Sequence, residues 1–229
     1  LLLLLLLLLL PQTSKYIMVT RDLRDVAYSW HNHLMTAFKS KFWGVIDALP
    51  GRAGPTIMDV AAKEPTPHAL FLDMIDDASD GAETGVWSYF HHLGTWWQYR
   101  HLPNIKFVHY AAMKANPKQV INDIAEFIGV EADPKLVDAV AQKTAFNQMK
   151  KDSPKILGPA FDAAFATKEG EVGGHNFIFK GTNGRWKDDV TEEESAKYIK
   201  YATERLGEEG MQWLTEGKLV KTGKTSDEL

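Results

Sequence analysis

The chain has 229 residues, a formal net charge of −4 and no cysteine. The acidic balance provides no broad positive field, so we expect no nucleic-acid or membrane partner, and any anion site must be local. The absence of cysteine excludes disulfides, thiolate catalysis and thiolate-bound metals, and it agrees with a cytoplasmic location.

Residues 1–10 are ten consecutive leucines. A run this short cannot cross a bilayer, which needs about 20 apolar residues. It also lacks the basic region and cleavage site of a signal peptide. We interpret it as a placeholder for residues of unassigned identity, and we expect residues 11–229 to begin inside a domain.

The stretch YIMVTRDLRDVAYSW at 16–30 predicts a strand followed by a helix. Residues 15–20 form an apolar, β-branched run that is typical of a buried strand. From Leu23 onward the apolar residues recur at helical spacing, which predicts a helix over 22–38 with Asp22 as its N-cap. A strand followed directly by a helix is the start of a βα unit in an α/β fold.

The rest of the chain predicts more helix than strand. Residues 50–85 are rich in Pro, Gly and Asp and indicate an elaborated surface region. Residues 150–187 have little periodicity and many glycines, and a stretch this long without structure is usually functional. The other predicted elements are helices over 70–75, 86–99, 113–128 and 134–149, a strand over 105–110, and a last helix from the capping box at Thr191–Glu194 to Gly207.

The histidines do not form a metal-binding pattern. His31 and His33 are two residues apart, and His91 and His92 are adjacent, so helical geometry points each pair in different directions. We therefore expect no metal cofactor.

Arg21 and Ser29 are candidates for an anion site. Arg21 follows the predicted strand, and ligands in open α/β sheets bind outside the carboxyl ends of strands. Helix amides at the same point also favour anions. Ser29 lies seven residues after Asp22, so it returns to the same helix face about 10 Å further along the axis. Spacing alone favours the simpler interpretation, in which Arg21 is a surface arginine and Ser29 is an ordinary serine on a helix face.

This stretch resembles the 3′-phosphate-binding strand and helix of the cytosolic-type sulfotransferases. These enzymes depend on 3′-phosphoadenosine-5′-phosphosulfate (PAPS), and their pattern is close to YVxRNPKDVAVS. Other segments resemble the same family. They are GVWSYFHHLGTWW (family G-x-W-F-x-H…WW), FVHYAAMKANP (YEDMKENP), AEFIGV (AEFLG), KTAFNQMKKD (HTSFxxMKKN) and FKGTNGRWKDDVT (RKGxxGDWKxxFT).

The resemblance implies a P-loop-NTPase-like parallel sheet flanked by helices, with a long loop covering the nucleotide. It implies that Arg21 and Ser29 bind the 3′-phosphate. Tyr110 and Thr144 would contact the adenine edge and Phe146 its face, although Thr144 could instead bond to its own helix. Phe179, Lys180, Gly181 and Arg185 would lie in the loop that closes over the phosphate.

The sequence departs from the family at three points. The catalytic Lys and His of the family are expected upstream of Pro11, so no catalytic residue is assigned within this sequence, and the domain at 11–229 is expected to be N-terminally incomplete. Phe179 replaces the arginine of the family and removes one phosphate contact. The dimer motif K-x-x-x-T-V-x-x-x-E is only partly present, with Lys187 and Thr191 matching but Glu192 and Ala196 not.

The resemblance predicts an enzyme that moves a sulfuryl group from PAPS to a hydroxyl or amine of a small-molecule acceptor. Residues 40–85 and 87–99 are candidates for the acceptor pocket, although most aromatic side chains of 87–99 are expected to pack in the core. Two alternatives remain open: a catalytically inactive nucleotide-binding relative, and a P-loop nucleotide kinase-like phosphotransferase, for which no Walker A motif is seen.

Overall fold

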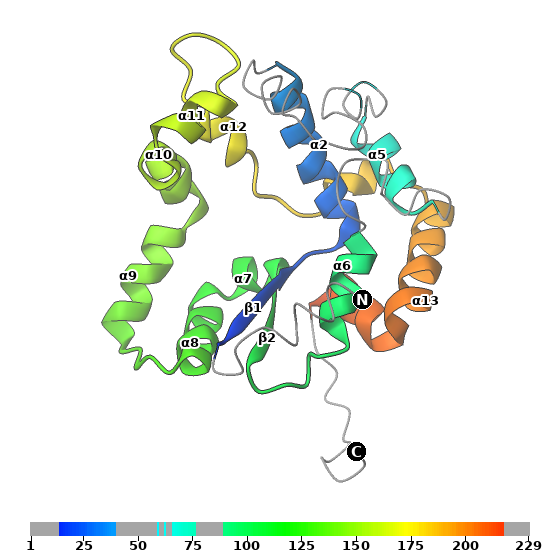
Figure 1. Cartoon of the computed structure of the whole chain (residues 1–229), viewed down its shortest axis with the longest axis horizontal. Helices are drawn as coiled ribbons and strands as arrows, with labels where there is room; N and C mark the ends of the chain where they lie inside the picture. Colours follow the sequence, from blue (N-terminus) through cyan, green and yellow to red (C-terminus); the bar gives the residue numbers. More distant parts are fainter. Residues whose placement is uncertain (1–13, 40–58, 60–61, 63–65, 77–88, 218–229) are drawn as a thin grey trace.

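The computed structural model describes residues 14–39, 59, 62, 66–76 and 89–217. Within them, two short strands lie between two groups of helices (Figure 1). The elements are β1 (Tyr16–Thr20), α2 (Leu23–Lys39), α5 (Pro67–Met74), α6 (Tyr89–Trp97), β2 (Ile105–His109), α7 (Tyr110–Ala115), α8 (Pro117–Ile128), α9 (Pro134–Thr144), α10 (Phe146–Leu157), α11 (Pro159–Phe165), α12 (Gly174–Phe177), the 3₁₀ helix η2 (Arg185–Asp188) and α13 (Glu192–Glu216).

The strands β1 and β2 are parallel, in a register that pairs Tyr16 with Ile105 and Thr20 with His109. Parallel neighbours need a long crossover, which here includes α2, α5 and α6. The α/β class predicted from the sequence is confirmed. Because both strands end at the same paired residues, the segments that follow them start side by side.

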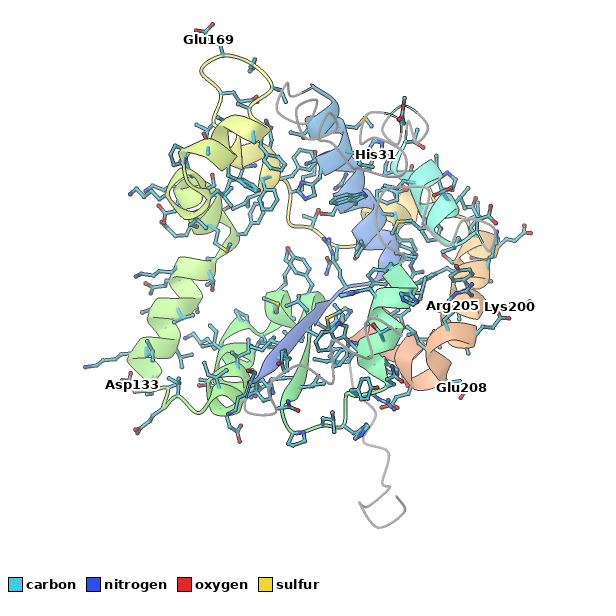
Figure 2. All side chains as sticks on the ribbon, in the orientation of Figure 1. His31, Asp133, Glu169, Lys200, Arg205 and Glu208 are labelled. Atoms are coloured by element: carbon cyan, nitrogen blue, oxygen red, sulfur yellow. The ribbon has the colours of Figure 1, made fainter. Side chains whose placement is uncertain are left out.

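The main core lies on the α2, α5, α6 and α13 side of the strands. Leu23, Phe71, Leu93, Tyr198 and Leu214 are completely or almost completely buried there. In Figure 2 the labelled Lys200 and Glu208 of α13 lie on the outer side of this group, whereas Arg205 stacks on the ring of the buried Tyr201, 3.3 Å from its centroid. No described helix is long and apolar enough to cross a bilayer.

The other helices form an arc that leaves the sheet and returns to α2. It begins after β2 with α7, continues through α8, α9 and α10, and reaches α2 again where α11 and α12 pack against it (Figure 1). After α12 the chain crosses back toward the start of α2 and forms η2 there. The arc, the strands and α2 therefore surround a common interior.

The predicted first strand and helix are confirmed in position almost to the residue, but the strand is not buried as expected, since Ile17 and Val19 are 41% and 55% exposed. The Asp22 carboxylate accepts the backbone N–H of Arg24 at 2.9 Å, which is the N-cap interaction expected from the sequence. The capping box of α13 is also present, with reciprocal bonds between Thr191 and Glu194. Gly129 ends α8 in the left-handed conformation, with φ of 79°.

Two predicted helices are wrong because each is broken in the structure. The helix expected over 113–128 is the end of α7 plus α8, separated at Asn116, whose φ and ψ are −137° and 64°. A residue before proline is disfavoured from helical geometry, and Pro117 then starts α8. The helix expected over 134–149 breaks at Ala145, which has an extended ψ of 137°.

The expectations for 105–110, 150–187 and the last helix also need correction. Tyr110 is not in the strand but begins α7. Residues 150–187 are not structureless, since they contain the end of α10, then α11 and α12, and the longer irregular stretches are 166–173 and 178–184. The last helix does not end at Gly207; it kinks there, with φ of 73°, and its buried residues Trp213 and Leu214 continue the core beyond the kink.

The segments proposed for the acceptor pocket are only partly described. Residues 40–58 and 77–88 lie outside the described residues. Of the aromatic residues in α6, Phe90 and Trp97 are buried in the core against Tyr201 and Trp213, as the core-packing interpretation predicted.

Candidate functional site

Arg21 and Tyr110 meet because β1 and β2 end in register. Thr20 pairs with His109, and the next residue of each chain segment is Arg21 and Tyr110 respectively. The guanidinium of Arg21 lies over the Tyr110 ring, 4.5 Å from its centroid. This cation–π contact holds a positive charge at the carboxyl end of the sheet, where open α/β sheets bind ligands.

The loop after α12 supplies the hydrogen-bond partners of Arg21. Its Nε donates to Asn183 Oδ1 at 3.1 Å, and its Nη2 donates to the carbonyl of Thr182 at 2.8 Å. Tyr89 donates its hydroxyl to the carbonyl of Arg21 at 2.5 Å and so fixes the backbone at this point. Burial lowers the pKa of Arg21, opposed mainly by the nearby Asp25 carboxylate. The Arg21 side chain therefore remains positively charged although it is partly removed from water.

The charged first turn of α2 is used to hold the loop. Asp22 pairs with Arg24 at 2.6 Å, and the Arg24 guanidinium stacks on the Trp186 ring at 3.8 Å. Asp25 accepts the backbone N–H of Gly184 at 2.7 Å. Burial raises the pKa of Asp25, while the Gly184 bond lowers it. The RDLRD sequence thus connects the strand end to residues more than 150 positions later.

The loop lies directly on the Phe146 ring. A Cβ added at Gly181, where φ is +60°, would stand 2.4 Å from two atoms of that ring. Only glycine permits both this backbone conformation and this close approach. Gly184, with φ of 79°, gives the turn that brings its N–H to Asp25. The two glycines therefore set the position of the loop relative to α10 and α2.

Two lysines that the sequence interpretation missed also reach this loop. Lys114 of α7 donates its ammonium to the carbonyl of Gly181, and Lys150 of α10 donates to the carbonyl of Phe179 at 2.8 Å. Lys114 is within the MKANP stretch, and Lys150 is within the MKKD stretch. Both positions matched the family pattern, so the signal was present in the sequence but carried no assigned role.

Thr144 bonds to its own helix, which was the alternative to an adenine contact. Its hydroxyl donates to the carbonyl of Val140 at 2.8 Å, one turn earlier in α9. The hydroxyl oxygen keeps lone pairs that can still accept a bond.

A single cavity of about 980 Å³ brings the predicted site residues together. It lies in the interior enclosed by α2, α7–α10 and the loop, and much of its remaining lining is apolar side chains of α8 and α9. Every site residue predicted from the sequence lines it: Arg21, Ser29, Tyr110, Thr144, Phe146, Phe179, Lys180, Gly181 and Arg185. Residues from four separate stretches of the chain therefore share one concave surface, whose lining includes the cations Arg21, Lys114, Lys180 and Arg185.

Comparison with known proteins agrees with this arrangement. A family profile described as "Sulfotransferase domain" matches residues 3–210. The chain belongs to the sulfotransferase family. Among curated relatives, Sulfotransferase 1A1 of Rattus norvegicus is 28% identical over 193 residues, covering 83% of this chain and 55% of that protein. Sulfotransferase 1E1 of Bos taurus is 30% identical over 121 residues, covering 53% and 39%. The chain spans about half the length, or less, of these two relatives.

Solved structures show the same fold. The mouse sulfotransferase SULT7A1 complexed with PAP superposes with a TM-score of 0.60 at 19% identity, over 89% of this chain and 62% of that one. Retinol dehydratase in complex with androsterone and inactive cofactor PAP gives a TM-score of 0.56 at 23% identity, over 85% and 48%. The sulfotransferase, P-loop-like fold expected from the resemblance is therefore confirmed.

No metal centre is found in the part of the chain that the structure describes. Within those residues, no group of three or more His, Asp or Glu side chains is placed to hold a metal ion. The cations that line the cavity, among them Arg21, Lys180 and Arg185, match the chemistry of an anionic ligand.

Proposed function

We propose that the protein transfers a sulfuryl group from PAPS to a hydroxyl or amine of a small-molecule acceptor. In this reaction the acceptor oxygen or nitrogen forms a new bond to sulfur. The bond between sulfur and the oxygen of the 5′-phosphate breaks, and adenosine 3′,5′-bisphosphate leaves. The acceptor proton passes to a base, a role that the family resemblance gives to a histidine upstream of Pro11.

The observation that carries this proposal is the convergence of the predicted nucleotide residues on one cavity, in a chain of the sulfotransferase family. Arg21 and Ser29 would bind the 3′-phosphate, with Lys180, the Gly181 backbone and Arg185 closing over it. Phe146 would stack on the purine, and Tyr110 and Thr144 would bond its edge.

Binding of the product nucleotide tests the site. In the complete protein, adenosine 3′,5′-bisphosphate should raise the melting temperature, because a ligand that binds only the folded state stabilises it. Arg21→Ala should abolish the rise. Lys200→Ala is the control for loss of a cation, since Lys200 lies exposed on the outer side of α13 in Figure 2, and it should keep the rise.

Turnover tests the reaction itself. The complete protein should consume PAPS with at least one member of a panel of phenols, alcohols and amines. Nucleotide binding without turnover on any acceptor would indicate a catalytically inactive relative. A rise in melting temperature with ATP but not with the bisphosphate would indicate a phosphotransferase, and no rise with either would refute the nucleotide site.

Three further expectations belong to the same proposal. Residues 11–229 form one sulfotransferase-like domain. The enzyme works in the cytoplasm, which agrees with a chain that has no cysteine. The partial match at Lys187 and Thr191 does not support the dimer of the family, and size-exclusion chromatography with light scattering measures that directly.

A further inference from the structure

Lys114 places a cation on the same surface as the Arg21–Tyr110 pair. It lies in α7, four residues after Tyr110, so helical geometry puts the two side chains on one face. Both line the cavity, together with Arg21. Lys114 therefore belongs to the wall at which the 3′-phosphate is proposed to bind.

The ammonium of Lys114 has no acidic partner among the described residues. Its recorded hydrogen bond goes to a neutral carbonyl, that of Gly181. The next lysine in the sequence shows the contrast, because Lys118 pairs with Asp138 at 2.7 Å on an exposed surface. A carbonyl is a weaker partner for an ammonium than an anion is. When a phosphate enters the cavity, the Lys114 ammonium should therefore bind a phosphate oxygen in preference to the Gly181 carbonyl.

Three backbone carbonyls of this loop each accept a hydrogen bond from a cationic side chain. The carbonyls of Phe179, Gly181 and Thr182 accept bonds from Lys150, Lys114 and Arg21 respectively. These three cations come from α10, α7 and the junction between β1 and α2, and they meet a stretch of four residues. Two of them, Arg21 and Lys114, also line the cavity.

Position 179 has lost a charge that the family resemblance expects there. Phe179 offers an aromatic ring in place of a guanidinium, and Lys180 and Arg185 lie 5.3 Å and 5.6 Å from the centre of that ring. A phosphate bound near Gly181 then lacks one cation from the loop. Lys114 is already in contact with Gly181 from the opposite wall.

We propose that Lys114 binds the 3′-phosphate of the nucleotide beside Arg21 and supplies the cation that Phe179 does not. This inference rests on the proposed function, since it assumes that the cavity holds the nucleotide. Without ligand, Lys114 holds the loop through the Gly181 carbonyl. With ligand, its ammonium exchanges that carbonyl for a phosphate oxygen.

Calorimetric titration of the complete protein with two nucleotides tests the proposal. Adenosine 3′,5′-bisphosphate carries the 3′-phosphate, and adenosine 5′-monophosphate does not. Lys114→Met and Lys114→Gln should each weaken bisphosphate binding by about tenfold or more, as expected for a lost charged hydrogen bond, and leave monophosphate binding within about twofold. Lys114→Arg should retain most of the affinity. Lys118→Met is the control and should bind both nucleotides as the wild type does.

The glutamine variant separates the two roles of the side chain. Its amide can still donate to the Gly181 carbonyl but carries no charge. Wild-type affinity in Lys114→Gln would mean that the residue only holds the loop, and it would overturn the proposal. Equal losses for both nucleotides, or wild-type affinity in Lys114→Met, would overturn it as well. If the wild-type protein binds neither nucleotide, the proposed function falls and this inference falls with it.

Discussion

An alanine at position 181 would collide with the Phe146 ring. Its Cβ would lie 2.4 Å from Cδ2 and Cε2 of that ring, closer than real Cβ contacts come, and the backbone φ of +60° would be strained as well. The left-handed conformation costs about 1–2 kcal/mol for a residue with a Cβ. Overpacking of this kind costs about 1–3 kcal/mol. Gly181→Ala should therefore disfavour the docked loop by about 2–5 kcal/mol.

Gly170→Ala is the matched control for this prediction. Gly170 has a similar φ of +75°, but nothing lies within 4 Å of an added Cβ. Gly170→Ala should lower the free energy of unfolding only by the cost of the left-handed backbone, about 1–2 kcal/mol. The difference between the two variants isolates the collision with Phe146.

Urea unfolding measures the free energy of unfolding, and hydrogen exchange at Gly184 measures whether the loop stays docked. The Gly184 amide is bonded to Asp25 in the structure, so it should be protected in the wild type and in Gly170→Ala. In Gly181→Ala it should exchange faster. Equal free energies of unfolding in the two variants, together with a protected Gly184 amide, would refute the proposed contact between Gly181 and Phe146.

Two other predictions concern the elements that hold the site. Thr20→Val should lower the free energy of unfolding by about 1–3 kcal/mol in urea titration, because the buried indole N–H of Trp213 loses its acceptor at 2.9 Å; a loss below about 0.5 kcal/mol would contradict this. Asp25→Asn should change the pH dependence of stability. The raised pKa of Asp25 means that the native state binds more protons than the unfolded state between the ordinary carboxyl pKa and the raised one. Wild-type stability relative to the variant should therefore increase as the pH falls through that window, and a constant or opposite difference would count against the buried carboxylate.

Local patterns predicted the start of the chain and the caps well. The strand and helix over 16–38 follow from short-range spacing and from the Asp22 cap, both of which act within a few residues. The break at Asn116 could also have been predicted, since a residue followed by Pro117 is a local signal. The break at Ala145 could not, because nothing in the neighbouring sequence interrupts the helical pattern.

The candidate site likewise contains residues that the sequence predicted and contacts that it did not. Family resemblance identified Arg21, Tyr110 and Phe146 as members of one nucleotide site, and all three line one cavity. It did not identify Lys114, whose contact is with a residue 67 positions later. The Asp25 contact with Gly184 spans 159 positions and was equally invisible to a local pattern.

The sequence by itself determined which residue types were available: a strand ending in Arg21, a helix carrying Ser29, and glycines at 181 and 184 that accept positive φ. The tertiary structure decided which of them meet. The parallel register of Thr20 with His109 puts Arg21 against Tyr110, and the return of the chain after α12 brings Thr182 and Asn183 to the same guanidinium. Such contacts depend on long-range strand pairing and on cations finding distant carbonyls, and neither leaves a periodic trace in the sequence.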